Sequence, residues 1–165
     1  MVQVITGGQT GVDRAALDVA LEDDIDYGGW CPRGGWAEDM TEPPGLLAAY
    51  PKLKETPSDD PAQRTEWNVR DADAVLLITD GSGLSASKGT ALAESFAEKY
   101  DKALMVMNVE DEDDVERAGI WLTELLTAHT VDQDFQLSIG GPRESESPGI
   151  YQKTRDVLPG LLEAL

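Results

Sequence analysis

A cluster of glycines and polar residues follows the apolar run Val2 to Thr6. It reads Gly7-Gly8-Gln9-Thr10-Gly11, and Asp13 and Arg14 come shortly after it. Glycines after a strand let the backbone approach a ligand, and the next helix offers free N–H groups to an anion. The spacing matches neither a Walker A loop nor the dinucleotide fingerprint. We therefore expect an anion-binding loop. A tight strand-to-helix turn, with Asp13 as an acid in the first turn of the helix, would give the same sequence pattern.

A second charged, glycine-rich stretch spans residues 31–39. Arg33 lies between a proline and Gly34, where a guanidinium group can reach a carboxylate or a phosphate. Glu38 and Asp39 could act as general bases or could pair with Arg33. Cys31 is the only cysteine, and His129, the only histidine, lies far along the chain, so we expect neither a thiol enzyme nor a zinc site.

Three further polar stretches lie next to apolar runs. In residues 64–70, Arg64 and Asn68 share one helix face, where they could meet a ligand or form surface pairs, as could Glu66 with Arg70. In residues 80–90, a Ser/Gly-rich loop leads to Lys88-Gly89-Thr90 at a helix start, a second possible anion cradle. Glu94 could pair with Lys88 or face the ligand. Residues 140–151 supply Arg143 and Ser145 before the last helix.

The overall charge makes these basic positions informative. Lys and Arg number 13 against 32 Asp and Glu, which gives a net charge of −19. Such a surface repels nucleic acid and anionic lipid, so we expect neither as a partner. Four of the seven arginines nevertheless lie in or beside stretches rich in Gly, Pro, Ser or Thr: Arg14, Arg33, Arg64 and Arg143. Positive charge kept there in an acidic chain favours a bound anion.

The elements that position these residues alternate between strands and helices. We predict strands over 2–6, 26–30, 74–79, 103–109 and 135–139, and helices over 12–21, 61–72, 88–100 and 115–128. Ser147 is expected to cap a final helix that Pro159 kinks or shortens. The pattern predicts a single α/β domain over residues 1–165, a three-layer Rossmann-like fold with a mostly parallel sheet of about five strands and helices on both faces.

Parallel strands bring their carboxyl ends to one edge of the sheet, where ligands of such folds bind. We therefore expect the loops named above to meet there. The apolar runs are too short to span a bilayer, and a single cysteine suits a reducing compartment, so we expect a cytoplasmic protein. Trp30 and Trp36 flank the second stretch and could stack on a ligand ring or line a subunit contact.

Five sequence blocks together resemble a known family, the "putative molybdenum carrier" family. They are GGQTGVDRAALDVA, CPRGGWAED, RTEWNVRDADAVLLI, KGTALAESFA and GPRESESPGIY, and they span nearly the whole chain. The family belongs to the Rossmann-like superfamily of DNA-processing protein A and the "lonely guy" cytokinin-activating proteins. The resemblance implies a domain that binds a nucleotide or nucleotide-like ligand. The family's name suggests molybdenum cofactor, a phosphorylated pterin, as cargo.

The "lonely guy" relatives hydrolyse the N-glycosidic bond of nucleoside monophosphates. Their motif is Pro-Gly-Gly-x-Gly-Thr with a Glu three residues later, whereas this chain has Ser85-Ala86-Ser87-Lys88-Gly89-Thr90, with Glu94 four residues after Thr90. The resemblance thus implies a retained phosphate cradle, and the missing residues count against hydrolysis.

Three functional hypotheses follow, and none requires a bound metal ion. The first is a binding protein for a phosphorylated small molecule, and it forms a homo-oligomer, a dimer or tetramer. Its candidate ligand-binding residues are Gly7, Gly8, Gln9, Thr10, Gly11, Asp13, Arg14, Arg33, Gly34, Arg64, Asn68, Lys88, Gly89, Thr90, Arg143 and Ser145. The second is an N-glycoside hydrolase that uses one of the carboxylates Asp13, Glu38, Asp39, Glu66 or Glu94. The third is a nucleotide sensor whose ligand changes its assembly.

Overall fold

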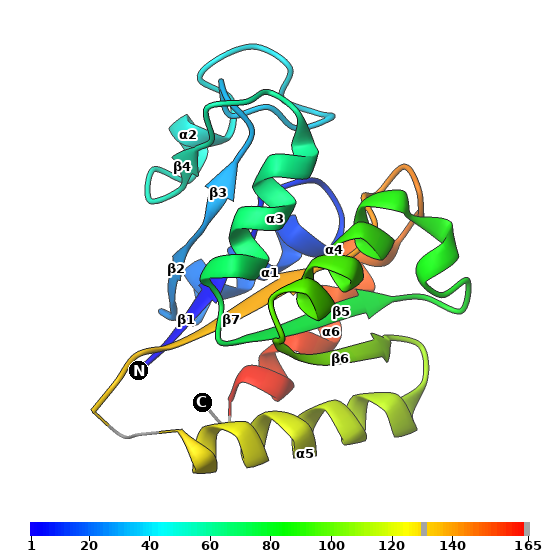
Figure 1. Ribbon diagram of the computed structural model, residues 1–165. Coiled ribbons are helices and arrows are strands. Elements are labelled where there is room, and N and C mark those ends of the chain that lie inside the picture. The colour runs from blue at the N-terminus through cyan, green and yellow to red at the C-terminus, as the bar shows by residue number, and fades with distance from the viewer. Residues whose placement is uncertain (130–131, 164–165) are drawn as a thin grey trace.

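A five-stranded parallel sheet forms the middle layer of the computed structural model, which describes residues 1–129 and 132–163 (Figure 1). Its strands are β1 (Val2–Ile5), β2 (Asp26–Gly28), β5 (Ala74–Thr79), β6 (Ala103–Asn108) and β7 (Phe135–Gly140). Their order is β2-β1-β7-β5-β6, and each adjacent pair is parallel. The predicted α/β fold with its parallel sheet is confirmed.

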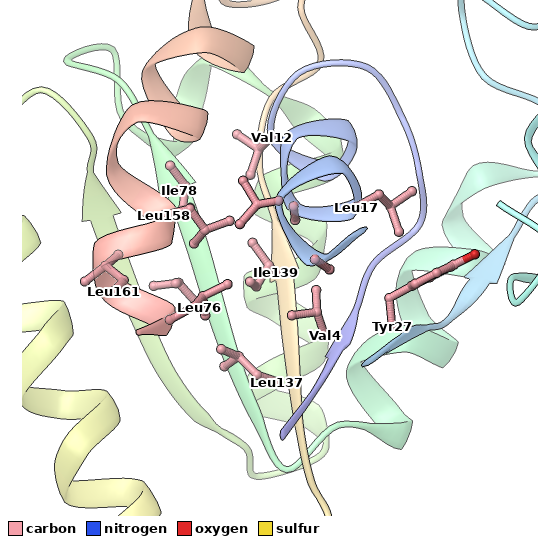
Figure 2. Packing of buried hydrophobic residues seen from close by; sticks show 14 of the residues in the cluster. Val4, Val12, Leu17, Tyr27, Leu76, Ile78, Leu137, Ile139, Leu158 and Leu161 are labelled. Carbon is pink, nitrogen blue, oxygen red and sulfur yellow. The ribbon is translucent and has the colours of Figure 1, made fainter. Parts of the chain in front are cut away.

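Helices cover both faces of this sheet, as the side-chain alternation in β5 shows. Leu76 and Ile78 point into a core formed with α1 (Val12–Glu22), α5 (Glu112–Ala128) and α6 (Ile150–Leu162). Figure 2 shows these two side chains with labelled core residues of α1 and α6. Val75 and Leu77 point the other way, against α3 (Pro61–Asp71) and α4 (Lys88–Lys99). Burial on both faces explains why β5 is a continuous apolar run.

The strand predicted over 26–30 is broken at Gly29. Its φ is +122°, and a Cβ there would lie 2.5 Å from the Thr6 carbonyl oxygen. The chain therefore leaves the main sheet, and β3 (Trp30–Cys31) pairs with β4 (Lys54–Glu55) in a small parallel ladder that the sequence analysis did not predict. The short helix α2 (Leu46–Ala49) and the 3₁₀ turn η1 (Leu84–Ala86) complete the regular elements of the described residues.

Two predicted helix starts are wrong, and in each case a carboxylate explains the difference. Helix α5 begins at residue 112 rather than 115, because Asp111 accepts the N–H of Asp113 and caps the helix. Helix α6 begins at residue 150 rather than near Ser147, because Glu144 accepts the N–H groups of Gly149 and Tyr151. Helix α6 also runs through Pro159 to Leu162, and so it is not ended there.

None of the helices in the described residues is both long and apolar enough to cross a membrane.

Gly141, just after β7, has no room for a side chain. A Cβ there would lie 2.3 Å from the Ile78 carbonyl oxygen and 2.5 Å from a Val12 methyl group, whereas a Cβ at Gly160 meets no atom within 4 Å. We predict that Gly141→Ala lowers the free energy of unfolding by about 1–3 kcal/mol or more. Gly160→Ala, within α6, should raise it by about 0.5–1 kcal/mol. Urea unfolding of both variants measures the contrast, and equal effects would contradict this packing.

Candidate functional site

A cleft opens at the carboxyl ends of the central strands, between the chain segments that follow β1 and β7 and the helices α3 and α4. Four of the five polar stretches singled out in the sequence meet there, the one in residues 64–70 as part of helix α3, whereas the stretch over residues 31–39, which was expected there too, does not line the cleft. The cleft is lined by Thr6, Gly7, Gln9 and Asp13, by Arg64 and Asn68 of α3, by Ser87, Gly89 and Thr90 around the start of α4, and by Gly140, Gly141, Arg143 and Glu146 after β7. Asn68 also holds the Trp30 backbone through two hydrogen bonds.

The guanidinium group of Arg64 lies at the inner wall of the cleft, with the residue only 7% exposed. Its Nη1 donates to the Gly7 carbonyl oxygen at 3.1 Å, and its Nε donates to the Pro61 carbonyl oxygen at 3.3 Å. A Cβ at Gly7 would lie 2.5 Å from Arg64 Cδ, so only glycine permits this approach. Burial lowers the pKa of Arg64, because it penalises the charged form.

Asp13 is a buried acid, 8% exposed, in the first turn of α1. Its Oδ2 lies 3.9 Å from Arg64 Nη1. Burial raises the pKa of Asp13 from 3.8 to about 6, although Arg64, Arg14 and the backbone N–H groups of Gln9 and Gly7 oppose the rise. This carboxyl group therefore titrates close to neutral pH, as groups in functional sites often do.

Two buried hydrogen-bond donors in the cleft have no partner within the described residues. The Oε1 atom of Gln9 accepts the N–H groups of Thr10 at 3.0 Å and of Glu38 at 2.9 Å. These two hydrogen bonds fix the orientation of the carboxamide and leave its Nε2 without a partner. The hydroxyl of Thr6 also has none within the described residues. The two residues are 4% and 1% exposed and both line the cleft. An unmet buried donor is costly, so both favour an acceptor atom of a ligand.

The N-terminus of α4 faces the same cleft. Ser87 caps the helix by accepting the Thr90 N–H at 3.2 Å. A Cβ at Gly89, the second residue of α4, would have no neighbour within 4 Å, so a side chain can be added there without a clash. Arg143 adds a half-buried guanidinium group, and its charge contributes to lowering the pKa of Arg64. The positive end of a helix dipole and two cations thus share one cleft.

Glu38 and Asp39, expected as possible bases or as partners of Arg33, are engaged elsewhere. Glu38 accepts hydrogen bonds from the hydroxyls of Thr10 and Ser145. Asp39 makes a bidentate pair with Arg14, with both N–O distances at 2.8 Å. These contacts join the segments around the cleft, and none of the residues lines it. Glu38 and Asp39 therefore stabilise the arrangement of the loops around the cleft.

Other predicted residues also lie away from the cleft lining. Arg33 and Gly34 line a separate groove with Trp36. Arg33 Nη2 lies 3.7 Å from Asp59 Oδ2. A Cβ at Gly8 or Gly11 would press on Leu46 or on the Pro142 carbonyl, so these glycines serve close packing. Lys88 is exposed, and Glu94 is half-buried outside the lining.

The outer face of α3 holds no part of the cleft. Glu66 accepts hydrogen bonds from Lys99 and Tyr100 rather than pairing with Arg70. Trp30 packs edge-on against Trp67 with ring centres 4.8 Å apart, rather than over the cleft. Cys31 is buried, and burial raises the pKa of its thiol to about 11, so it stays protonated at neutral pH.

Sequence reasoning missed Thr6 and Ser87 as cleft residues. Thr6 is the polar residue that ends the first apolar run, and Ser87 precedes the Lys88-Gly89-Thr90 segment as a helix cap. A polar residue at each strand or loop boundary was the available signal.

The model of the circularly permutated YpsA SLOG family matches residues 4–162. The chain belongs to this SLOG family. A similar solved structure is the 1.45 Å crystal structure of "Putative molybdenum carrier protein" from Syntrophus aciditrophicus SB. It is 39% identical, with a TM-score of 0.81 over 97% of this chain and 94% of that one. The predicted family and Rossmann-like fold are confirmed. The curated proteins include no match to the chain.

In this SLOG protein, stability should depend on pH through Asp13. The folded state binds the Asp13 proton more tightly, with a pKa of about 6 against 3.8, so stabilisation is full below pH 3.8 and is lost as pH rises through 6. The shift corresponds to about 3 kcal/mol. We predict that the unfolding free energy of Asp13→Asn, minus that of the parent protein, rises by this order between pH 3.5 and pH 7. Urea unfolding across this range measures it, and a flat difference would contradict the buried carboxyl group.

Proposed function

We propose that the cleft binds a phosphorylated, nucleotide-like small molecule and that the protein is a binding or carrier protein for it. The observation that carries the proposal is the convergence of unmet donors on one buried place. Gln9 Nε2 and the Thr6 hydroxyl have no acceptor in the described residues, and the Arg64 guanidinium group lies in the same cleft. A phosphoryl group supplies several strong acceptor oxygens and negative charge.

The two sides of the cleft suit different parts of such a ligand. The start of α4 at Gly89 lines the cleft together with Arg143, and it suits a phosphoryl group that accepts backbone N–H groups. On the inner side, Gln9 Nε2 and the Thr6 hydroxyl donate to oxygens of the same phosphoryl group, and the ring or sugar of the ligand takes the outer side of the cleft. Molybdenum cofactor, a phosphorylated pterin, combines both parts. The name of the 39% identical neighbour supports it as a candidate cargo.

Gly89→Asp tests the phosphate position without disturbing the fold, because the site has room and an acid at a helix N-terminus is favourable. We expect the parent protein to bind adenosine monophosphate or a phosphorylated pterin more tightly than the dephosphorylated compound. Gly89→Asp should weaken binding of the phosphorylated compound at least about tenfold, since like charges 4 Å apart repel by about 4 kcal/mol near a surface.

Gly89→Asn is the matched control, of the same size and without the charge, and it should bind nearly as the parent does. Calorimetric titration and thermal shift measure both variants. Equal binding of phosphorylated and dephosphorylated compounds, or no binding of either, would overturn the proposal.

One observation favours a second candidate, hydrolysis of an N-glycosidic bond in a nucleoside monophosphate. Of the five carboxylates proposed as catalytic, Asp13 alone is among the residues that line the cleft. An ionised carboxylate beside the sugar stabilises positive charge at its anomeric carbon as the bond to the base breaks. It can also take a proton from the water that attacks that carbon, and the same proton then passes to the nitrogen of the departing base, so that free base and the sugar phosphate are released.

For this candidate, we predict release of free base from nucleoside monophosphates by the parent protein and a loss of at least about 100-fold in Asp13→Ala, the usual contribution of a general base. Glu66→Gln is the control, because that acid is bound by Lys99 and Tyr100 outside the cleft. Chromatographic detection of the base gives the rate. An inert parent protein would reject hydrolysis and leave the binding function standing.

A further inference from the structure

Among the described residues that line the cleft, Asp13 is the only buried carboxyl group. Gln9 Nε2, the Thr6 hydroxyl, Arg64 and the start of α4 all present N–H or O–H groups to the cleft. An ionised carboxylate can only accept. An oxyanion held by these donors therefore lies in the same cleft as the Asp13 carboxylate. Two neighbouring anions in a buried site repel each other, so keeping both of them unprotonated costs free energy.

The charged groups around the cleft leave Asp13 as the carboxyl group whose protonation state changes when an anion binds. Arg64 approaches from α3, and Arg14 acts from its own helix, α1. The segment after β7 brings Arg143 and Glu146 to the cleft. Glu146 is exposed and accepts the Arg143 backbone N–H at 3.1 Å. The Arg143 guanidinium group lies 3.7 Å from carboxylate oxygens of both Glu146 and Glu38. The lining residues around the start of α4, which are Ser87, Gly89, Thr90 and Ala93, carry no charge.

We propose that Asp13 makes the cleft select its oxyanion by protonation: a tetrahedral oxyanion binds together with one proton, which lies between an Asp13 carboxyl oxygen and an oxygen of the anion. The proposal rests on the anion-binding function proposed above. Hydrogen phosphate brings that proton with it. Sulfate and the dianion of a phosphate monoester carry none at pH 8, so Asp13 must take it from solvent. The raised pKa of Asp13 agrees with this, because its carboxyl group already holds a proton more tightly than a free one.

The test compares sulfate with inorganic phosphate by calorimetric titration at pH 7.5 and 8.5. Sulfate affinity should fall about tenfold over this range, since one proton is taken up per anion. Phosphate affinity should change by less than about twofold, because hydrogen phosphate keeps its proton. Titrations in buffers of different ionisation enthalpy should show uptake of one proton with sulfate and none with phosphate, a result that needs no variant.

Asp13→Asn should remove the pH dependence of sulfate binding, because a carboxamide does not titrate. Glu66→Gln, an acid removed from the outer side of α3, should keep the parent behaviour. Adenosine monophosphate should follow the sulfate pattern with pH and bind more tightly than sulfate at pH 7.5, as expected if the natural occupant is the phosphoryl group of a larger molecule.

The outcomes separate the two proposals. If no oxyanion binds at either pH, the proposed binding function itself fails. Sulfate affinity equal to or above that of adenosine monophosphate would overturn its nucleotide-like part. If anions bind but sulfate and phosphate share one pH dependence, or Asp13→Asn leaves the sulfate dependence unchanged, the role of Asp13 is wrong while the binding function stands.

Discussion

The buried guanidinium group of Arg64 is the constraint on which the site depends. Taking a cation out of water is costly unless hydrogen bonds and opposite charge compensate it. Here two carbonyl oxygens accept its N–H groups, and Asp13 lies 3.9 Å away, beyond hydrogen-bond distance. The side chain thereby joins α3 to the segment after β1 and requires glycine at position 7. The side chain thus places a buried cation inside a protein whose net charge is −19.

The layers of the fold could be read from the sequence because their signals are local. The run Ala74 to Thr79 is apolar at every position but the last, as a strand buried on both faces requires. Glycines after β1 and β7 mark the strand ends that form the cleft, and parallel pairing brings those ends to one edge. The convergence of these segments therefore followed from strand direction alone.

The parts that could not be predicted depend on contacts between distant residues. Helix α3 is polar along its length and reads as a surface helix, so the burial of Arg64 becomes visible only when Gly7, 57 residues away, is placed beside it. Glu38 and Asp39 resembled catalytic acids, but their partners come from other segments of the chain. The start of α6 was misplaced for a different, local reason, because Glu144 accepts the N–H groups of Gly149 and Tyr151 from the preceding turn and Ser147 does not cap the helix.

The hydrogen bonds of Glu38 have a thermodynamic consequence for the cleft. The Glu38 carboxylate joins Thr10, after β1, to Ser145, after β7, and the Glu38 backbone N–H donates to Gln9 Oε1 and so fixes that carboxamide. The loops around the entrance are thus ordered in the folded chain before any guest arrives. A ligand that binds to loops already ordered does not have to offset the loss of their conformational entropy. Its affinity then depends mainly on how completely the cleft replaces the ligand's own hydration shell.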